Sequence, residues 1–118
     1  MKTQDNTVNN AWQPYNGGST LGERGSEDGI IRCDESFPLG ARITLEEGGN
    51  LPWAITCGIS GFMVHTAFAS TEEEGVQKYE AMKTELAEIL ERVEAAPSED
   101  EAEDMLVSWA EEFTARYL

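Results

Sequence analysis

The sequence predicts an α+β fold, an antiparallel β-meander of four to five strands followed by two C-terminal helices packed on one sheet face. Three observations predict it. Between residues 30 and 69, apolar and polar residues alternate at the period of a strand. Short turn signals separate these runs, which favours antiparallel neighbours. After residue 71 the apolar residues recur at helical spacing, and strands followed by helices are typical of this fold class.

The strand region begins after the pair Asp28-Gly29, which favours a tight hairpin turn. Pro38 interrupts the next apolar run because proline cannot donate to a strand ladder. Glycine-rich segments at residues 47–52 and 59–61 separate the later runs. The predicted strands span residues 30–34, 41–46, 53–58 and 62–69.

Two capping patterns predict where the helices begin. Thr71 is followed three residues later by Glu74, and Ser98 by Glu101, which is the capping-box spacing. Pro97 stops the first helix. The apolar stripe of the first helix comprises Val76, Tyr79, Met82, Leu86, Ile89, Leu90 and Val93, and that of the second Met105, Leu106, Trp109, Phe113 and Tyr117.

The chain of 118 residues suits one domain, which we place at residues 19–118, preceded by a flexible N-terminal arm at residues 1–18. Trp12 and Tyr15 are unusual in such an arm, and we expect them to dock on the body. No apolar run approaches the length of a membrane span, and MKTQDNTVNN lacks the apolar segment of a secretory signal. We therefore expect a cytoplasmic protein with free thiols at Cys33 and Cys57.

Alternation assigns the strand residues to two faces of the sheet. The face expected to meet the helices carries Ile31, Cys33, Ala41, Ile43, Leu45, Trp53, Ile55, Cys57, Phe62, Val64 and Phe68. The open face is expected to carry Arg32, Asp34, Arg42, Thr44, Glu46, Ala54, Thr56, Met63, His65 and Ala67. A solvated surface is the simplest interpretation of the open face, and a homodimer interface through it is another. A third is a ligand site made by Arg32, Arg42, Thr44, Thr56 and His65, since arginine suits carboxylate and phosphate groups.

No catalytic set or metal site is predicted. Gly58-Ile59-Ser60-Gly61 lacks the spacing of a nucleophile elbow and precedes a strand instead of a helix. Alternation places Cys57 and His65 on opposite faces, which argues against a thiol–imidazole dyad. One His and two separated Cys cannot form a zinc tetrad without carboxylates. We expect no cofactor, and these features favour a binding protein over an enzyme.

The formal net charge is −15, and most of it lies in the C-terminal part. Residues 1–70 carry four Lys/Arg and eight Asp/Glu, whereas residues 71–118 carry four Lys/Arg and fifteen Asp/Glu. Such a charge disfavours nucleic-acid and membrane partners and favours a basic protein partner, as in an immunity or inhibitor protein. An anionic-ligand protein or minor enzyme on the open face is the alternative. The expected partner-binding residues are Glu80, Glu88, Glu91, Glu99 and Glu103.

Overall fold

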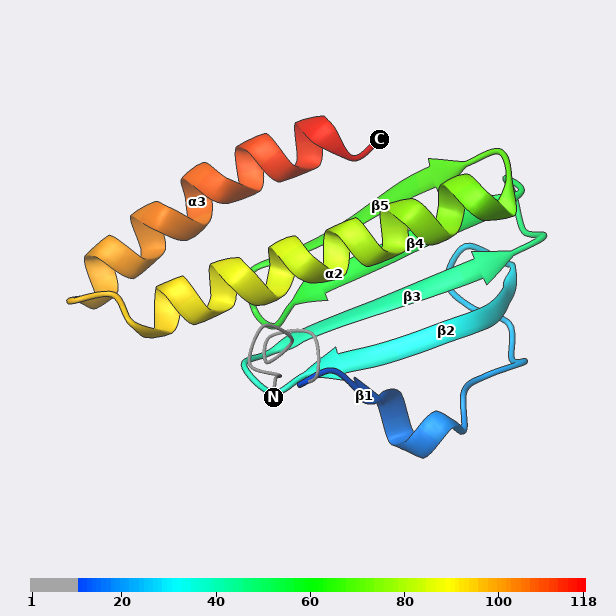
Figure 1. Ribbon diagram of the computed structural model, residues 1–118, viewed down its shortest axis with the longest axis horizontal. Helices are drawn as coiled ribbons and strands as arrows, with labels where there is room; N and C mark the ends of the chain where they lie inside the picture. The colour runs from blue at the N-terminus through cyan, green and yellow to red at the C-terminus, as the bar shows by residue number, and fades with distance from the viewer. Residues whose placement is uncertain (1–10) are drawn as a thin grey trace, which may run out of the picture.

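The computed structural model describes residues 11–118 and confirms the predicted α+β architecture (Figure 1). Five antiparallel strands follow one another across a single sheet in the order β1-β2-β3-β4-β5. The strands are β1 (Gln13–Pro14), β2 (Ile30–Phe37), β3 (Ala41–Glu47), β4 (Trp53–Ile59) and β5 (Met63–Ala69). The helices are α2 (Glu72–Glu94) and α3 (Glu99–Arg116).

Both predicted helix caps are present. The Thr71 hydroxyl accepts the backbone N–H of Glu74 at 3.2 Å, and the Glu74 carboxylate accepts the N–H of Ser70 at 3.1 Å. The Ser98 hydroxyl accepts the N–H of Glu101 at 3.2 Å. These bonds satisfy N–H groups that have no partner within the helix, so they fix where α2 and α3 begin.

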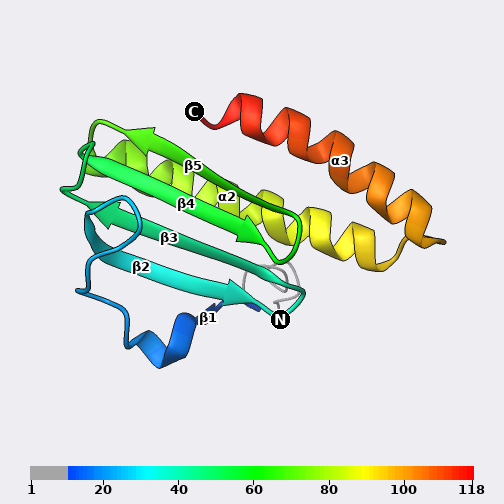
Figure 2. The ribbon, with the colours of Figure 1, turned by 180° about the vertical axis from the view of Figure 1, so that it is seen from behind.

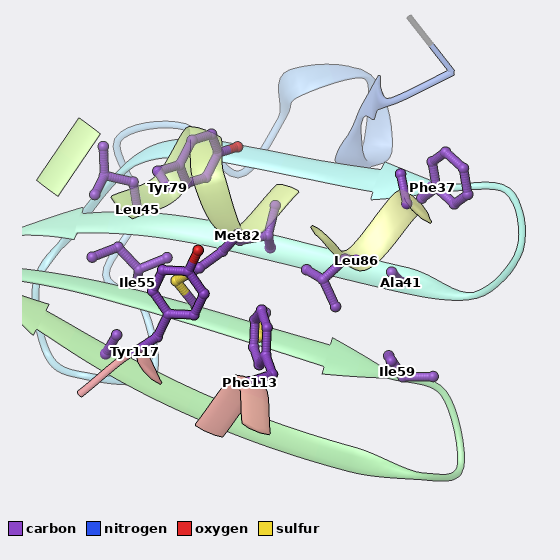
Figure 3. Close-up of a cluster of buried hydrophobic side chains, with 14 of the residues drawn as sticks. Phe37, Ala41, Leu45, Ile55, Ile59, Tyr79, Met82, Leu86, Phe113 and Tyr117 are labelled. Atoms are coloured by element: carbon purple, nitrogen blue, oxygen red, sulfur yellow. The ribbon is translucent and has the colours of Figure 1, made fainter. Parts of the chain in front are cut away.

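The hydrophobic core lies between the sheet and the helices (Figure 3). Ile43 and Ile55 rise from the central strands and are fully buried, as are Met82 and Leu86 of α2. Phe113 reaches the same core from α3. Burying each such side chain contributes about 1.5–3 kcal/mol to folding, which accounts for the docking of α2 across the sheet.

A β-bulge in β2 changes one part of the expected face assignment. Ile31 pairs with Glu46, whereas Cys33 pairs with Leu45, so Arg32 is an extra residue between them. A bulge breaks the alternation of side chains. Ile31 therefore lies on the open face, and its assignment to the helix-facing side is wrong.

The expected phase of β5 is wrong by one residue. Cross-strand partners share a face, and His65 pairs with the helix-facing Cys57 while Ala67 pairs with Ile55. Val64 pairs with Gly58 of the open face. Met63, His65 and Ala67 thus face the helices, while Val64 and Phe68 do not. The turn occupies residues 60–62, and Phe62 belongs to it.

The helix α3 lies beyond the edge of β5, and it is less buried than α2. Seen from the open face, strands cover the N-terminal part of α2 but none covers α3 (Figure 2). Phe113 is the only residue of α3 that is buried, and Trp109 stacks on it with ring centroids 4.4 Å apart while staying half-exposed. Among the described residues, no helix is long and apolar enough to cross a membrane.

Residues 11–18 dock on the sheet. Gln13 pairs with Ser36 of β2, and Trp12 is 5% exposed, with its ring 5.2 Å from that of Phe37. Tyr15 opens a short 3₁₀ turn, η2 (Tyr15–Gly18). Residues 1–10 of the expected arm lie outside the described residues.

Candidate functional site

Three of the five expected ligand residues gather on the open face. Arg42, Thr44 and Thr56 line a hollow of about 450 Å³. Gly58 of β4 also lines this hollow. A second hollow of about 720 Å³ shares Arg42, Gly58 and Val64 with the first, so the two form one depression across the sheet.

The guanidinium of Arg42 is fixed by contacts with Asp34 and Tyr15. It donates from Nε and Nη2 to the two carboxylate oxygens of Asp34, at 2.9 and 2.7 Å. The Asp34 side chain is completely buried, whereas that of Arg42 is 43% exposed. The Tyr15 ring lies 3.6 Å from the guanidinium carbon. The hydrogen bond to Asp34 raises the pKa of Arg42, so this cation neutralises a buried carboxylate before any ligand arrives.

A second buried carboxylate fastens the segment 20–29 over the open face. Glu46 is 2% exposed and accepts the N–H groups of Glu27 at 3.1 Å and Gly29 at 3.0 Å. The hydroxyl of Thr20 donates to Asp34 at 2.8 Å. A Cβ at Gly25 would collide with the Glu46 carboxylate, which would have to shift from its place. The segment thus closes one end of the hollow.

The other two expected ligand residues lie elsewhere. The bulge in β2 directs Arg32 to Glu47, where its Nε donates to the carboxylate at 2.9 Å. His65 is on the helix-facing side, and its Nε2–H donates to the carbonyl oxygen of Tyr117 at 2.5 Å. Its ring also meets Phe113 edge-on. His65 therefore holds the end of the chain against β5 and does not line the hollow.

Cys57 and His65 are direct cross-strand partners, so the expectation that they occupy opposite faces is wrong. Their chemistry is nevertheless unsuited to a dyad. Burial raises the pKa of the Cys57 thiol to about 12, which keeps it protonated. The Nε2 of His65 is engaged by Tyr117. Within residues 11–118, no group of three or more His, Cys, Asp or Glu side chains is arranged to hold a metal ion.

Three of the four cations of the helices pair with carboxylates of the fold. Lys83 is 8% exposed and lies 2.8 Å from Glu35 of β2, which also accepts the Tyr79 hydroxyl at 2.6 Å. Arg116 pairs with Glu85 at 3.1 Å. Lys78 lies 3.5 Å from Glu74 and donates to the carbonyl of Phe68 at 2.7 Å. Each of these cations is thus committed within the fold.

The outer carboxylates of the helices consequently form no ion pairs among the described residues. Glu88, Glu91, Glu99 and Glu103 are exposed and take part in no ion pair among the described residues, whereas Glu80 is exposed and lies 3.8 Å from Lys83. Of the described helix cations, Arg92 alone has no carboxylate within ion-pair distance. We use the term acidic surface for the exposed, unpaired Glu72, Glu73, Glu88, Glu91, Glu94, Glu99, Asp100, Glu101, Glu103, Asp104, Glu111 and Glu112.

No family model, no curated protein and no solved structure matches this chain.

Sequence reasoning did not identify the partners of Arg42. Asp34 was assigned to the same face, but its diagonal position across the β2–β3 hairpin from Arg42 depends on the register. Tyr15 stood out only as an aromatic residue in a polar segment. Thr66, whose hydroxyl lies 3.0 Å from that of Thr56, was missed because the phase of β5 was wrong.

Proposed function

We propose that this protein is a non-enzymatic binding protein that recognises a basic protein partner through the part of the acidic surface at the junction of α2 and α3, as an immunity- or inhibitor-type protein does. One observation carries the proposal: three of the four cations of α2 and α3 pair with carboxylates within the fold, which leaves the outer carboxylates without an ion-pair partner among the described residues. Such a field speeds association with a cationic surface and is screened by salt. The two free thiols fit the expected cytoplasmic location.

The junction of α2 and α3 is the part of the acidic surface that we assign to the partner. Glu91 lies in the last turns of α2, and Glu99 and Glu103 occupy the first turns of α3. All three are exposed. Carboxylates at the start of a helix also suit the helix dipole, so they add charge to the surface at little cost in stability.

The experiment compares two variants of equal charge with the wild type, each immobilised and exposed to host lysate at low salt. Glu91, Glu99 and Glu103 become Gln in the first variant, which changes the formal charge from −15 to −12. Glu23, Glu72 and Glu73 become Gln in the matched control, with the same change in charge. We expect the wild type and the control to retain a basic protein that a salt wash releases, and the first variant to lose it. Retention by all three, or by none, would contradict the proposal.

A small-ligand function on the open face is the second candidate, because the depression around Arg42 has the volume of a ligand site. The commitment of Arg42 to Asp34 and the absence of His65 from the lining weaken it for anions. A thermal-shift measurement with acetate and phosphate tests it. A ligand at a hundred times its Kd stabilises the fold by about 2.7 kcal/mol, which is easily measured.

A further inference from the structure

The two edges of the sheet are protected unequally. At the β2 edge, Gln13 and Pro14 pair with the end of the strand. Near the start of β2, the backbone carbonyl of Glu23 accepts the N–H of Ile31 at 2.8 Å. The opposite edge is β5. Its sequence, MVHTAFA, contains no Lys, Pro or other feature that proteins use to block an open edge.

Within residues 11–118, only the end of the β5 edge is covered. The N–H of Phe68 donates to the carbonyl of Leu118 at 3.1 Å, and its carbonyl accepts Lys78 at 2.7 Å. These bonds show that the backbone groups of Phe68 point away from β4. By the two-residue period of a strand, those of Thr66 and Val64 point the same way.

The backbone of β4 supports this alternation of outward and inward groups. The Thr44 hydroxyl donates to the carbonyl of Thr56 at 3.5 Å, so that carbonyl points toward β3 and not toward Thr66. None of the described residues bonds to the outward N–H or C=O groups of Val64 or Thr66. The Val64 side chain is 78% exposed. Residues 63–66, which we call the free edge, therefore present four unpaired backbone groups.

The space beside the free edge is bordered by α3, and no strand of the described residues fills it. The helix α3 lies beyond β5, with no strand in front of it in Figure 2. Leu106 and Trp109 of this helix are partly buried at the margin of the core, and Met105 is also only partly buried. A further strand hydrogen-bonded to β5 would cover them, as the present strands cover the N-terminal part of α2.

We propose that an extended segment of the basic partner adds to β5 as a sixth strand along the free edge. This inference rests on the proposed function, because charge selects the occupant. A second copy of this chain would bring another −15 to the interface. A cationic strand would instead approach Glu111 and Glu112, which are exposed on the turn of α3 that carries Phe113, and Phe113 contacts His65 of β5. Its apolar side chains would meet Leu106 and Trp109.

The test uses a fluorescent peptide of alternating Lys and Val, seven residues long, and the same peptide N-methylated at every interior amide. Methylation keeps the charge and side chains but removes the backbone donors. Fluorescence anisotropy at low salt should give an affinity for the unmodified peptide at least tenfold higher. Equal affinities for wild type, or no binding of either peptide, would overturn the proposal.

Val64→Pro removes an outward N–H without removing a hydrogen bond between β4 and β5, and Val64→Thr is the matched control that keeps it. We expect the proline variant to lose the preference for the unmodified peptide and the threonine variant to keep it. A preference that survives in Val64→Pro, with the fold intact by circular dichroism, counts against the proposal. Should the proline variant not fold, the comparison of the two peptides on wild type decides alone.

The two proposals fail in different ways. If both peptides bind equally and the Glu91, Glu99 and Glu103 variant weakens both, the acidic surface binds cations and the sixth strand is refuted. If the preference persists unchanged in that variant, the sixth strand stands and the assignment of the acidic surface fails. Sedimentation of the wild type gives the remaining outcome: a dimer that Val64→Pro dissociates would make a second copy the occupant and overturn the proposal.

Discussion

Replacing Arg42 by Ala should destabilise the protein, because Asp34 would remain buried without its cation. Breaking a buried ion pair costs about 3–5 kcal/mol. Arg42 is 43% exposed, so water can enter the vacated space and we reduce this value to about 2–3 kcal/mol. The stack on Tyr15 adds about 0.5–1 kcal/mol. The expected total loss is roughly 3 kcal/mol.

The assay is urea unfolding followed by tryptophan fluorescence, since Trp12 and Trp53 are both buried. Arg24→Ala is the matched control, because its ion pair with Asp28 is exposed on both sides and is worth less than about 1 kcal/mol. A double-mutant cycle with Asp34→Asn isolates the pairwise energy. We expect a coupling of about 2 kcal/mol between Arg42 and Asp34.

A loss below about 1 kcal/mol for Arg42→Ala, with negligible coupling to Asp34, would refute this reasoning. The guanidinium would then be dispensable to the fold and available to a ligand. That result would revive the anion-binding alternative, which the ion pair now weakens.

Phe113→Ala should cost about 3–5 kcal/mol in urea unfolding, because this ring is fully buried. Trp109→Ala should cost only about 1–2 kcal/mol, since the ring is half-exposed; equal losses would contradict the burial of α3. The free energy of unfolding should fall as pH rises from about 9 to about 12, because unfolded Cys57 ionises there while the folded thiol stays protonated. At about pH 10.5 the wild type should have lost roughly 2 kcal/mol more than Cys57→Ala, and parallel pH profiles would contradict this. Tyr79→Phe should cost about 1 kcal/mol by removing the hydrogen bond to Glu35, and an unchanged urea midpoint would count against it.

The helices and the strand order could be predicted because their signals are local. Thr71 and Ser98 cap the helices that their spacing indicates. The Asp28-Gly29 turn also forms, although the segment before it pairs with β2 only through a single bridge between Arg24 and Ile30. Asp28 has a φ of 69°, a conformation that Asp adopts more readily than most residues. Such preferences act within a few residues and need no knowledge of the tertiary structure.

The phase of β5 could not be predicted because it depends on what fills the space above the strand. Val64 looks like a core residue in the sequence, while Ala67 looks like a surface one. In the structure, Phe113 and Tyr117 occupy the space over β5, so small side chains fit beneath them. Val64 is left 78% exposed. Only the packing of the last helix turn decides between the two phases.

The candidate site could be predicted only in part, because alternation is reliable only where a strand is regular and its phase is known. Alternation placed Arg42, Thr44 and Thr56 together, because all three lie on the regular parts of β3 and β4. It failed for Arg32, which lies in the bulge, and for His65, which lies on β5. An error of one residue reverses the face of a strand side chain, so either a bulge, as at Arg32, or a misplaced strand start, as in β5, assigns a residue to the wrong face.

The acidic surface is not neutralised because most cations of the chain pair with buried or partly buried carboxylates. The fold buries or half-buries Asp34, Glu35 and Glu85, and each of them takes a cation. Burial without a partner would cost several kcal/mol per charge, so these pairings take precedence over any on the surface. With eight Lys/Arg against twenty-three Asp/Glu, few cations are left for the outer helix faces. A cationic partner could therefore pair with these carboxylates without displacing an ion pair of the fold.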